Sequence, residues 1–143
     1  MFNHREFEIK CFEPTVNVQI LSRLLDGSRL HQFKATFGPT LITGFARVKG
    51  HLVGILASDG ELSANAATKG AHFARLCTLR RIPMLFFVNT PPDSLFLSQT
   101  GTDGLTAKAR AQMMAAIATS STPKITVLMG GCYGPSAFAM VHQ

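Results

Sequence analysis

The residues with the clearest chemical potential are the glycine-rich segment 130–136, which reads Gly-Gly-Cys-Tyr-Gly-Pro-Ser. It follows an apolar run and precedes another, as expected of a connection between a strand and a helix. Glycines there allow backbone N–H groups to converge beside the positive end of the helix dipole. Such a point could bind a phosphate, or stabilise a thioester enolate in an oxyanion hole. A tight turn that relieves close packing explains the same glycines equally well.

Two known catalytic motifs can be compared with this segment. The phosphate loop requires a lysine after its second glycine, and none follows here. A cysteine version of the nucleophile elbow fits Gly130, Cys132 and Gly134, but its fold requires an acid and a histidine downstream. The chain has His142 after Cys132 but no Asp or Glu. A small buried residue is therefore the better interpretation of Cys132, and a nucleophile is the weaker one.

Other polar residues give weaker signals. His72 lies within an alanine-rich helical stretch, where a packed, hydrogen-bonded histidine is a better interpretation than a catalytic base. Asp59 and Glu61 resemble a carboxylate pair, but at a turn such residues are usually solvated. The three cysteines are far apart without a CxxC pair, and the five histidines lack metal-ligand spacing. These spacings predict neither a metal site nor a disulfide framework, and a reducing compartment is the default.

Around these residues the sequence predicts an alternating order of elements. A helix is expected over 17–25, and Gly27 follows it as a C-terminal stop signal. Strands over 40–48 and 52–57 are joined by a turn at Gly50-His51. An alanine-rich helix over 64–79 and a fully buried parallel strand over 84–88 come next. A long loop over 90–104, a possible lid, leads to a second helix over 106–119 and a second buried strand over 124–129.

This order predicts a layered α/β fold. Small residues at 67, 70, 71, 74 and 77 share one side of the alanine-rich helix and indicate very close packing on the sheet. In such folds functional residues gather at the carboxyl ends of the strands, here 58–60, 89–93 and 130–136.

Composition excludes several classes of protein. A length of 143 residues fits one domain, 1–143, and 15% charged residues against 46% hydrophobic ones suggests burial on several sides in an assembly. The net charge is +6, but the basic residues are scattered, so we expect no nucleic-acid partner. The apolar runs are too short to cross a membrane. The first ten residues lack a signal-peptide pattern.

A series of motifs in order resembles a known family. Residues 18–143 resemble the C-terminal, crotonase-type half of the carboxyltransferase (beta) subunit of biotin-dependent acyl-CoA carboxylases, especially the methylcrotonoyl-CoA and geranyl-CoA kinds. The resemblance implies an α/β fold of stacked crotonase (ClpP)-like ββα units, here a truncated C-terminal carboxyltransferase domain. The motifs are LDGSR at 25–29, FK at 33–34, TGFAR at 43–47, KGAHF at 69–73, RIP at 81–83, FVN at 87–89, PKIT at 123–126 and GGCYG at 130–134.

The resemblance also implies a reaction and its partners. Carboxyl transfer from carboxybiotin to an acyl-CoA would proceed through enolates held in backbone oxyanion holes, with biotin on a separate carrier domain or chain. The expected partners are a carboxyltransferase N-terminal half, a biotin carboxylase or biotin carrier subunit, and further copies of the chain. The mitochondrial matrix and the bacterial cytoplasm are both compartments in which this reaction and these partners are expected. The biotin-side oxyanion hole would fall at Gly134, Pro135 and Ser136, with Asn89, Gly130, Gly131 and Tyr133 on the cofactor side.

The sequence departs from the family pattern at the strand ends. Pro135 stands where the family has a small residue with a free N–H, and proline has none. Residues 90–93 replace a Thr-Gly-Phe motif, and Ser58-Asp59 replace paired asparagines. The family also continues beyond Gln143 and carries an N-terminal CoA-binding half. These departures support an alternative, an inactive truncated homologue that acts only in assembly with carboxylase subunits.

Overall fold

The computed structural model describes residues 16–58, 60–90 and 104–141. Within them five strands form one sheet in the order β1-β2-β3-β4-β5, with the first three antiparallel and the last three parallel. The strands are β1 (Leu30–Gln32), β2 (Leu41–Val48), β3 (His51–Ser58), β4 (Met84–Thr90) and β5 (Lys124–Cys132). The helices are α1 (Val16–Leu24), α2 (Ala64–Leu79), α4 (Gly104–Ala118) and α5 (Gly134–Phe138), with a 3-10 turn at Asp26–Ser28.

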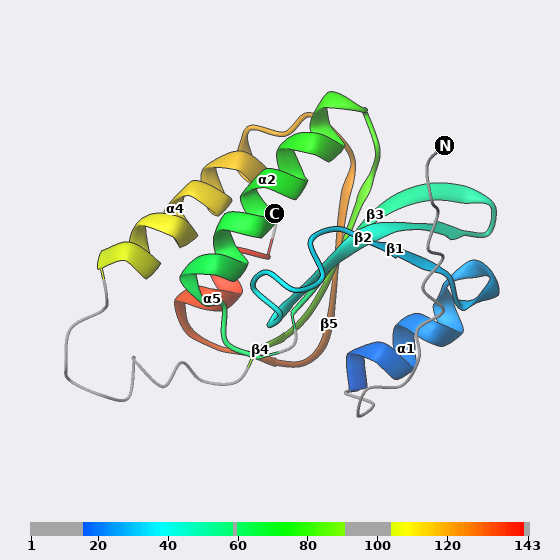
Figure 1. Ribbon diagram of the computed structural model, residues 1–143, viewed down its shortest axis with the longest axis horizontal. Helices are drawn as coiled ribbons and strands as arrows, with labels where there is room; N and C mark the ends of the chain where they lie inside the picture. The colour runs from blue at the N-terminus through cyan, green and yellow to red at the C-terminus, as the bar shows by residue number, and fades with distance from the viewer. Residues whose placement is uncertain (1–15, 59, 91–103, 142–143) are drawn as a thin grey trace.

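Helices cover the two faces of the sheet unequally. Helices α2, α4 and α5 lie together on one side, while α1 lies on the other, near the β2–β3 end (Figure 1). The larger core fills the space under α2 and α4 and contains Phe73, Phe86 and Met113. A smaller core joins Leu21 and Leu25 to Ile55 and Phe87 on the opposite face. The α/β layered fold predicted from the sequence is confirmed, and α2 has the predicted bounds.

Helix α2 approaches its neighbours closely because its inner side is built from small residues. Ser63 caps its first turn by accepting a hydrogen bond from the Ala66 N–H (3.3 Å). A Cβ atom on Gly70 would lie 2.6 Å from Met113 Sδ of α4, and one on Gly54 of β3 would lie 2.6 Å from Cys77 Sγ. The expected close packing on the sheet is therefore present, and α4 shares the same side of the helix.

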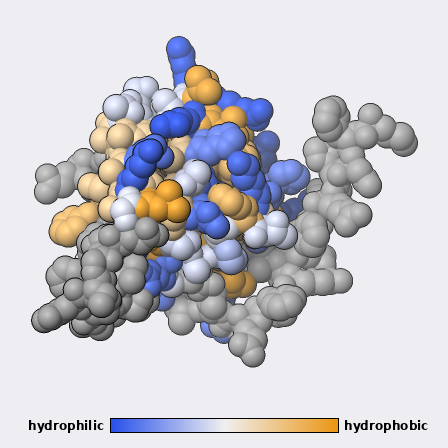
Figure 2. Space-filling view, turned by 60° about the vertical axis from the view of Figure 1, so that its left-hand side comes forward, coloured by the Kyte–Doolittle hydropathy of each residue, from blue (hydrophilic) through white to orange (hydrophobic). Residues whose placement is uncertain are grey.

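Strand β5 differs from the prediction. The sequence predicts a fully buried strand, yet β5 is the last strand of the sheet among the described residues, and Ile125 and Leu128 are 60% and 59% exposed. It also continues through Gly130 and Gly131 to Cys132, so these glycines belong to the strand and not to a turn. An apolar run fits a strand buried on both faces, but it cannot show whether neighbouring elements cover both. Figure 2 shows the molecule with its α4 side turned forward. On the coloured part of this surface, hydrophilic and hydrophobic residues are interspersed.

The segment between β1 and β2 is held against the start of α2. Gly38 has φ +55°, and a Cβ atom there would lie 2.6 Å from the backbone nitrogen of Ala66. Because both the left-handed conformation and the backbone contact require the absence of a side chain, only glycine fits here without strain.

We expect Gly38→Ala to be more destabilising than Gly50→Ala. Gly50 also has positive φ (+83°) but faces open space, so alanine there costs about 1–2 kcal/mol of left-handed strain. Gly38→Ala adds a clash with the α2 backbone, about 1–3 kcal/mol more. Urea unfolding of the two variants measures the difference directly. Equal losses would show that the segment does not rest on α2.

Candidate functional site at the strand ends

The carboxyl ends of β3, β4 and β5 are tied together by two side chains. The Asn89 N–H donates to Ser58 Oγ (2.8 Å), joining β4 to β3. The Asn89 side-chain Oδ1 accepts the Gly131 N–H (3.2 Å), joining β4 to β5. Ser58 Oγ in turn donates to the Phe87 carbonyl (3.4 Å). Ser58, Asn89 and Gly131, one from each segment that the sequence places at a strand end, therefore meet at one edge of the sheet.

The paired glycines of β5 make room for this asparagine. A Cβ atom on Gly130 would overlap Asn89 Oδ1, and one on Gly131 would lie 2.5 Å from the Thr90 carbonyl. The β4–β5 register also shifts between Val88 and Thr90, which is where the asparagine turns toward β5. Gly130 and Gly131 thus allow a close contact within the sheet and do not form the tight turn that the sequence offers as one explanation for them.

Helix α5 begins directly after these glycines. Tyr133 is its N-cap residue and is 57% exposed, and Gly134 follows with φ +67°. Pro135 and Ser136 lie in the first turn. The first N–H groups of a helix lack intrahelical acceptors, and Pro135 has no N–H to offer. Among residues 134–136, only Gly134 and Ser136 therefore have a backbone N–H to donate.

The two cysteines among the described residues differ in exposure. Cys132 is exposed, contrary to the expectation that it is buried, and it ends β5 without the sharp turn of a nucleophile elbow. Cys77 is fully buried, and burial raises the pKa of its thiol to about 12. Across the described ranges no group of three or more His, Cys, Asp or Glu side chains could hold a metal ion.

Glu61 and His72 are both engaged in contacts within the fold. Glu61 Oε1 lies 3.5 Å from Arg110 Nη2, and the Nε of the same arginine donates to the Leu62 carbonyl (2.9 Å). The sequence predicts a solvated carboxylate at Glu61, whereas the structure shows a paired one. His72 is exposed, but it is hydrogen-bonded as expected: its Nδ1 lies 3.1 Å from Lys34 Nζ. Its ring also packs edge-on against Phe33. Asp59 and residues 91–103 of the expected loop over 90–104, the possible lid, lie outside the described residues, while Thr90 ends β4 and Gly104 begins α4.

Lys69 is a buried polar residue that sequence reasoning missed. Its side chain is 2% exposed beneath the β1–β2 segment, and its Nζ donates to the Lys34 carbonyl at 3.4 Å. Burial lowers the pKa of the amine to about 8. The residues one and four positions after Lys69 are Gly70 and Phe73, and this small and apolar pattern is the available signal that the lysine faces inward.

We expect the desolvation of Lys69 to produce a specific pH dependence of stability. The pKa of Lys69 is lower in the folded protein than in the unfolded chain, so between about pH 8 and pH 10.5 the unfolded chain binds the extra proton. The free energy of unfolding should therefore gain a rising contribution from Lys69 over this range. The raised pKa of Cys77 makes the free energy of unfolding fall as pH rises, and it does so equally in the parent chain and in Lys69→Met. The difference in free energy of unfolding between these two proteins therefore isolates the contribution of the lysine. Urea unfolding at several pH values measures both proteins. If their free energies of unfolding change in parallel with pH, the low pKa is wrongly assigned to Lys69.

Thiol labelling should separate the two cysteines. In a Cys11→Ser background at pH 8, we expect iodoacetamide to modify Cys132 and to leave Cys77 unmodified until urea unfolds the chain, because a buried thiol is neither accessible nor ionised. Peptide mass spectrometry reads out both sites. Native labelling of Cys77 would contradict its burial.

The chain is similar to known carboxylase subunits. The family model described as "Carboxyl transferase domain" matches residues 11–143. The biotin-dependent 3-methylcrotonyl-coenzyme A carboxylase beta1 subunit of Mycobacterium tuberculosis is 43% identical over 85% of this chain and 23% of its own length. The mitochondrial methylcrotonoyl-CoA carboxylase beta chain of Dictyostelium discoideum is also 43% identical, over 85% of this chain and 20% of its own.

Solved structures agree with the sequence relatives. The geranyl-CoA carboxylase beta subunit of P. aeruginosa matches with a TM-score of 0.78 and 31% identity, over 90% of this chain and 25% of that one. A transcarboxylase 12S structure with methylmalonyl-coenzyme A bound matches with a TM-score of 0.75 and 31% identity, over 86% of this chain and 25% of that one. The chain thus spans about a quarter or less of the length of these relatives. It belongs to the carboxyl transferase domain family of biotin-dependent acyl-CoA carboxylases.

Proposed function

We propose that the chain forms one partial domain, 1–143, that supplies the biotin side of a carboxyltransferase. The reaction is carboxyl transfer from carboxybiotin to an acyl-CoA of the methylcrotonoyl type. The observation that carries this proposal is the meeting of the β3, β4 and β5 ends through Ser58, Asn89 and Gly131, directly before the start of α5.

The arrangement at the start of α5 suits a developing negative charge. Backbone N–H groups of a first helical turn lie at the positive end of the helix dipole and need no reorganisation during the reaction. Biotin, when carboxylated, supplies the activated carboxyl group. Gly134 and Ser136 would donate N–H groups to its ureido oxygen, while Asn89 holds Gly131 and the β5 end in place. Tyr133, exposed beside this turn, would cover one side of the bound ring.

The partners follow from the same proposal. Because the chain spans about a quarter or less of its relatives, an N-terminal carboxyltransferase half would complete the active site on the CoA side, and a biotin carrier would deliver the carboxyl group. The transcarboxylase 12S relative assembles as a hexamer, and we propose that this chain likewise acts in an oligomer. The Dictyostelium relative is mitochondrial and the Mycobacterium relative is bacterial, and either compartment suits the reaction.

Pro135 favours a second candidate function. It lies in the turn that must donate hydrogen bonds, and it has no N–H. Loss of one oxyanion donor reduces the rate by about 10²–10³-fold in other enzymes. A chain that retains the fold without this donor could act only by assembling with carboxylase subunits.

An assay of reverse transfer decides between the two. The full chain is mixed with the N-terminal half of the Mycobacterium tuberculosis relative, and free biotin accepts the carboxyl group from carboxylated methylcrotonoyl-CoA. We expect turnover that requires both proteins and rises about 10-fold or more in Pro135→Ala, because the substitution restores an N–H. Pro123→Ala, before β5, is the matched control and should leave the rate unchanged.

One result would count against the active carboxyltransferase. If the proteins co-elute in size-exclusion chromatography but neither the parent chain nor Pro135→Ala turns over, the assembly role stands. A separate result would count against the role given to Pro135: if Pro123→Ala raises the rate as much as Pro135→Ala, the missing N–H does not limit the rate.

A further inference from the structure

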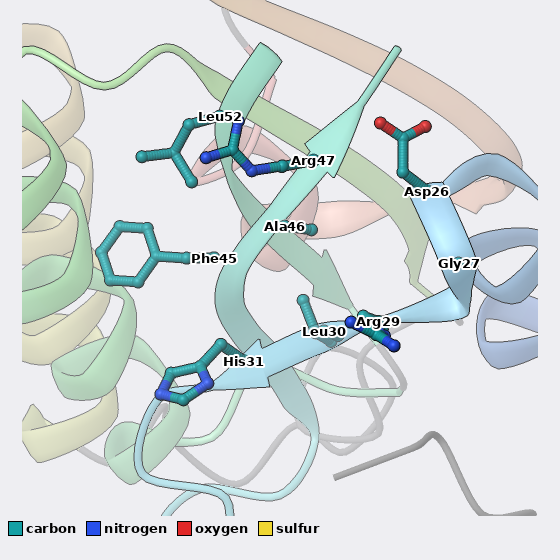
Figure 3. Close-up of a pocket in the computed structure, with 9 residues that line it drawn as sticks. All are labelled: Asp26, Gly27, Arg29, Leu30, His31, Phe45, Ala46, Arg47 and Leu52. Atoms are coloured by element: carbon teal, nitrogen blue, oxygen red, sulfur yellow. The ribbon is translucent and has the colours of Figure 1, made fainter. Parts of the chain in front are cut away.

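A cavity of about 560 Å³ lies beside the β1 edge of the sheet. Figure 3 shows Phe45 between Arg47 and Leu52 on one side and His31 on the other, with Arg29 and Asp26 across the strand. Its volume falls in the range of small-molecule sites, about 300–1,000 Å³. Gly27, Leu30 and Ala46 complete the lining.

The cavity exists because β1 is much shorter than β2 and β3. Residues of β1 pair with Gly44–Ala46, whereas β2 and β3 continue together to Val48 and His51. The far part of this hairpin therefore has no strand beside it among the described residues. The 3-10 turn at Asp26–Ser28 closes the step, since the Asp26 carboxylate accepts the N–H groups of Lys49 (3.0 Å) and Gly50 (2.6 Å).

The cavity has an apolar side. Phe45 is packed from behind by Phe73 of α2 (ring centroids 5.0 Å apart), so its ring is held in place. Leu52 is 44% exposed and lies on the same face of the sheet as Phe45, whereas Leu30 and Ala46 are already buried in the core on the other face. An alkyl chain could remove this surface from water at a gain of about 0.8 kcal/mol per buried CH₂.

The cavity also has a cationic side. Arg29 and Arg47 line it, against the single carboxylate of Asp26, which already accepts two backbone N–H groups. Arg47 Nη1 donates to the Gly50 carbonyl (2.8 Å), and this bond orients the guanidinium while leaving most of its five N–H donors for another acceptor. Arg29 takes part in a further contact and adds positive charge without needing to be unpaired.

From this combination we propose that the cavity binds a small organic anion with a short aliphatic chain. The carboxylate or phosphate head contacts the Arg47 guanidinium, and the chain lies against Phe45 and Leu52. The cavity is at the His51 end of β3, whereas Ser58 and the strand ends of the candidate site are at the other. The inference therefore does not rest on the proposed carboxyltransferase function.

Titrations of the full chain followed by amide NMR shifts test this site. We expect hexanoate and hexyl phosphate to cause saturable shifts at Phe45, Ala46 and Leu52, and uncharged hexanamide to bind at least about tenfold more weakly, because it loses the charge-assisted hydrogen bond. Comparing the two anions shows which head group the cavity prefers.

Matched variants identify the residues responsible. Arg47→Gln should reduce hexanoate binding to the level of hexanamide binding, and Leu52→Ser should weaken the binding of both hexanoate and hexanamide. Lys108→Gln removes an equal charge at an exposed position of α4 and should leave the binding of both ligands unchanged. Three results would each overturn the proposal: no saturable shifts with either anion, unchanged hexanoate binding in Arg47→Gln, or inorganic phosphate binding as tightly as hexyl phosphate.

Discussion

The hydrogen bonds made by Asn89 are the constraint on which the candidate site depends. Its backbone N–H contacts Ser58 of β3, and its side chain accepts the N–H of Gly131 in β5, so one residue aligns three strand ends. Gly130 and Gly131 lack side chains because the asparagine and the Thr90 carbonyl occupy that space. The start of α5 is placed by the last residues of β5, and its backbone donors are therefore positioned by this one contact.

The helical layer is constrained by a second kind of close approach. Gly54 and Gly70 allow Cys77 and Met113 to fill the space between α2, α4 and the sheet, and Gly38 lets the preceding segment rest on the α2 backbone. The same segment encloses Lys69, whose ammonium group finds one carbonyl at 3.4 Å. The low pKa of this lysine is a consequence of packing density, because burial disfavours its charged form.

The two ends of β3 present different chemistry. At the Ser58 end the fold brings together Asn89 of β4, the glycines of β5 and the start of α5. At His51 it offers guanidinium groups over aliphatic and aromatic side chains, which suits a charge that is already present in a ligand. The two regions lie at opposite ends of β3, and the small core around Ile55 and Ala57 lies between them.

Local patterns in the sequence determined the helices, the hairpin and the strand ends: the bounds of α2, the turn at Gly50, and the three segments that meet at Asn89. They also carried the family resemblance. Tertiary structure decided the rest. Whether β5 is covered, whether Gly130 and Gly131 turn or extend, and whether Cys132 and Lys69 face solvent all depend on neighbours distant in the chain. Periodicity records the local preference of a residue for a face of its own element, but burial is a property of what packs against that face.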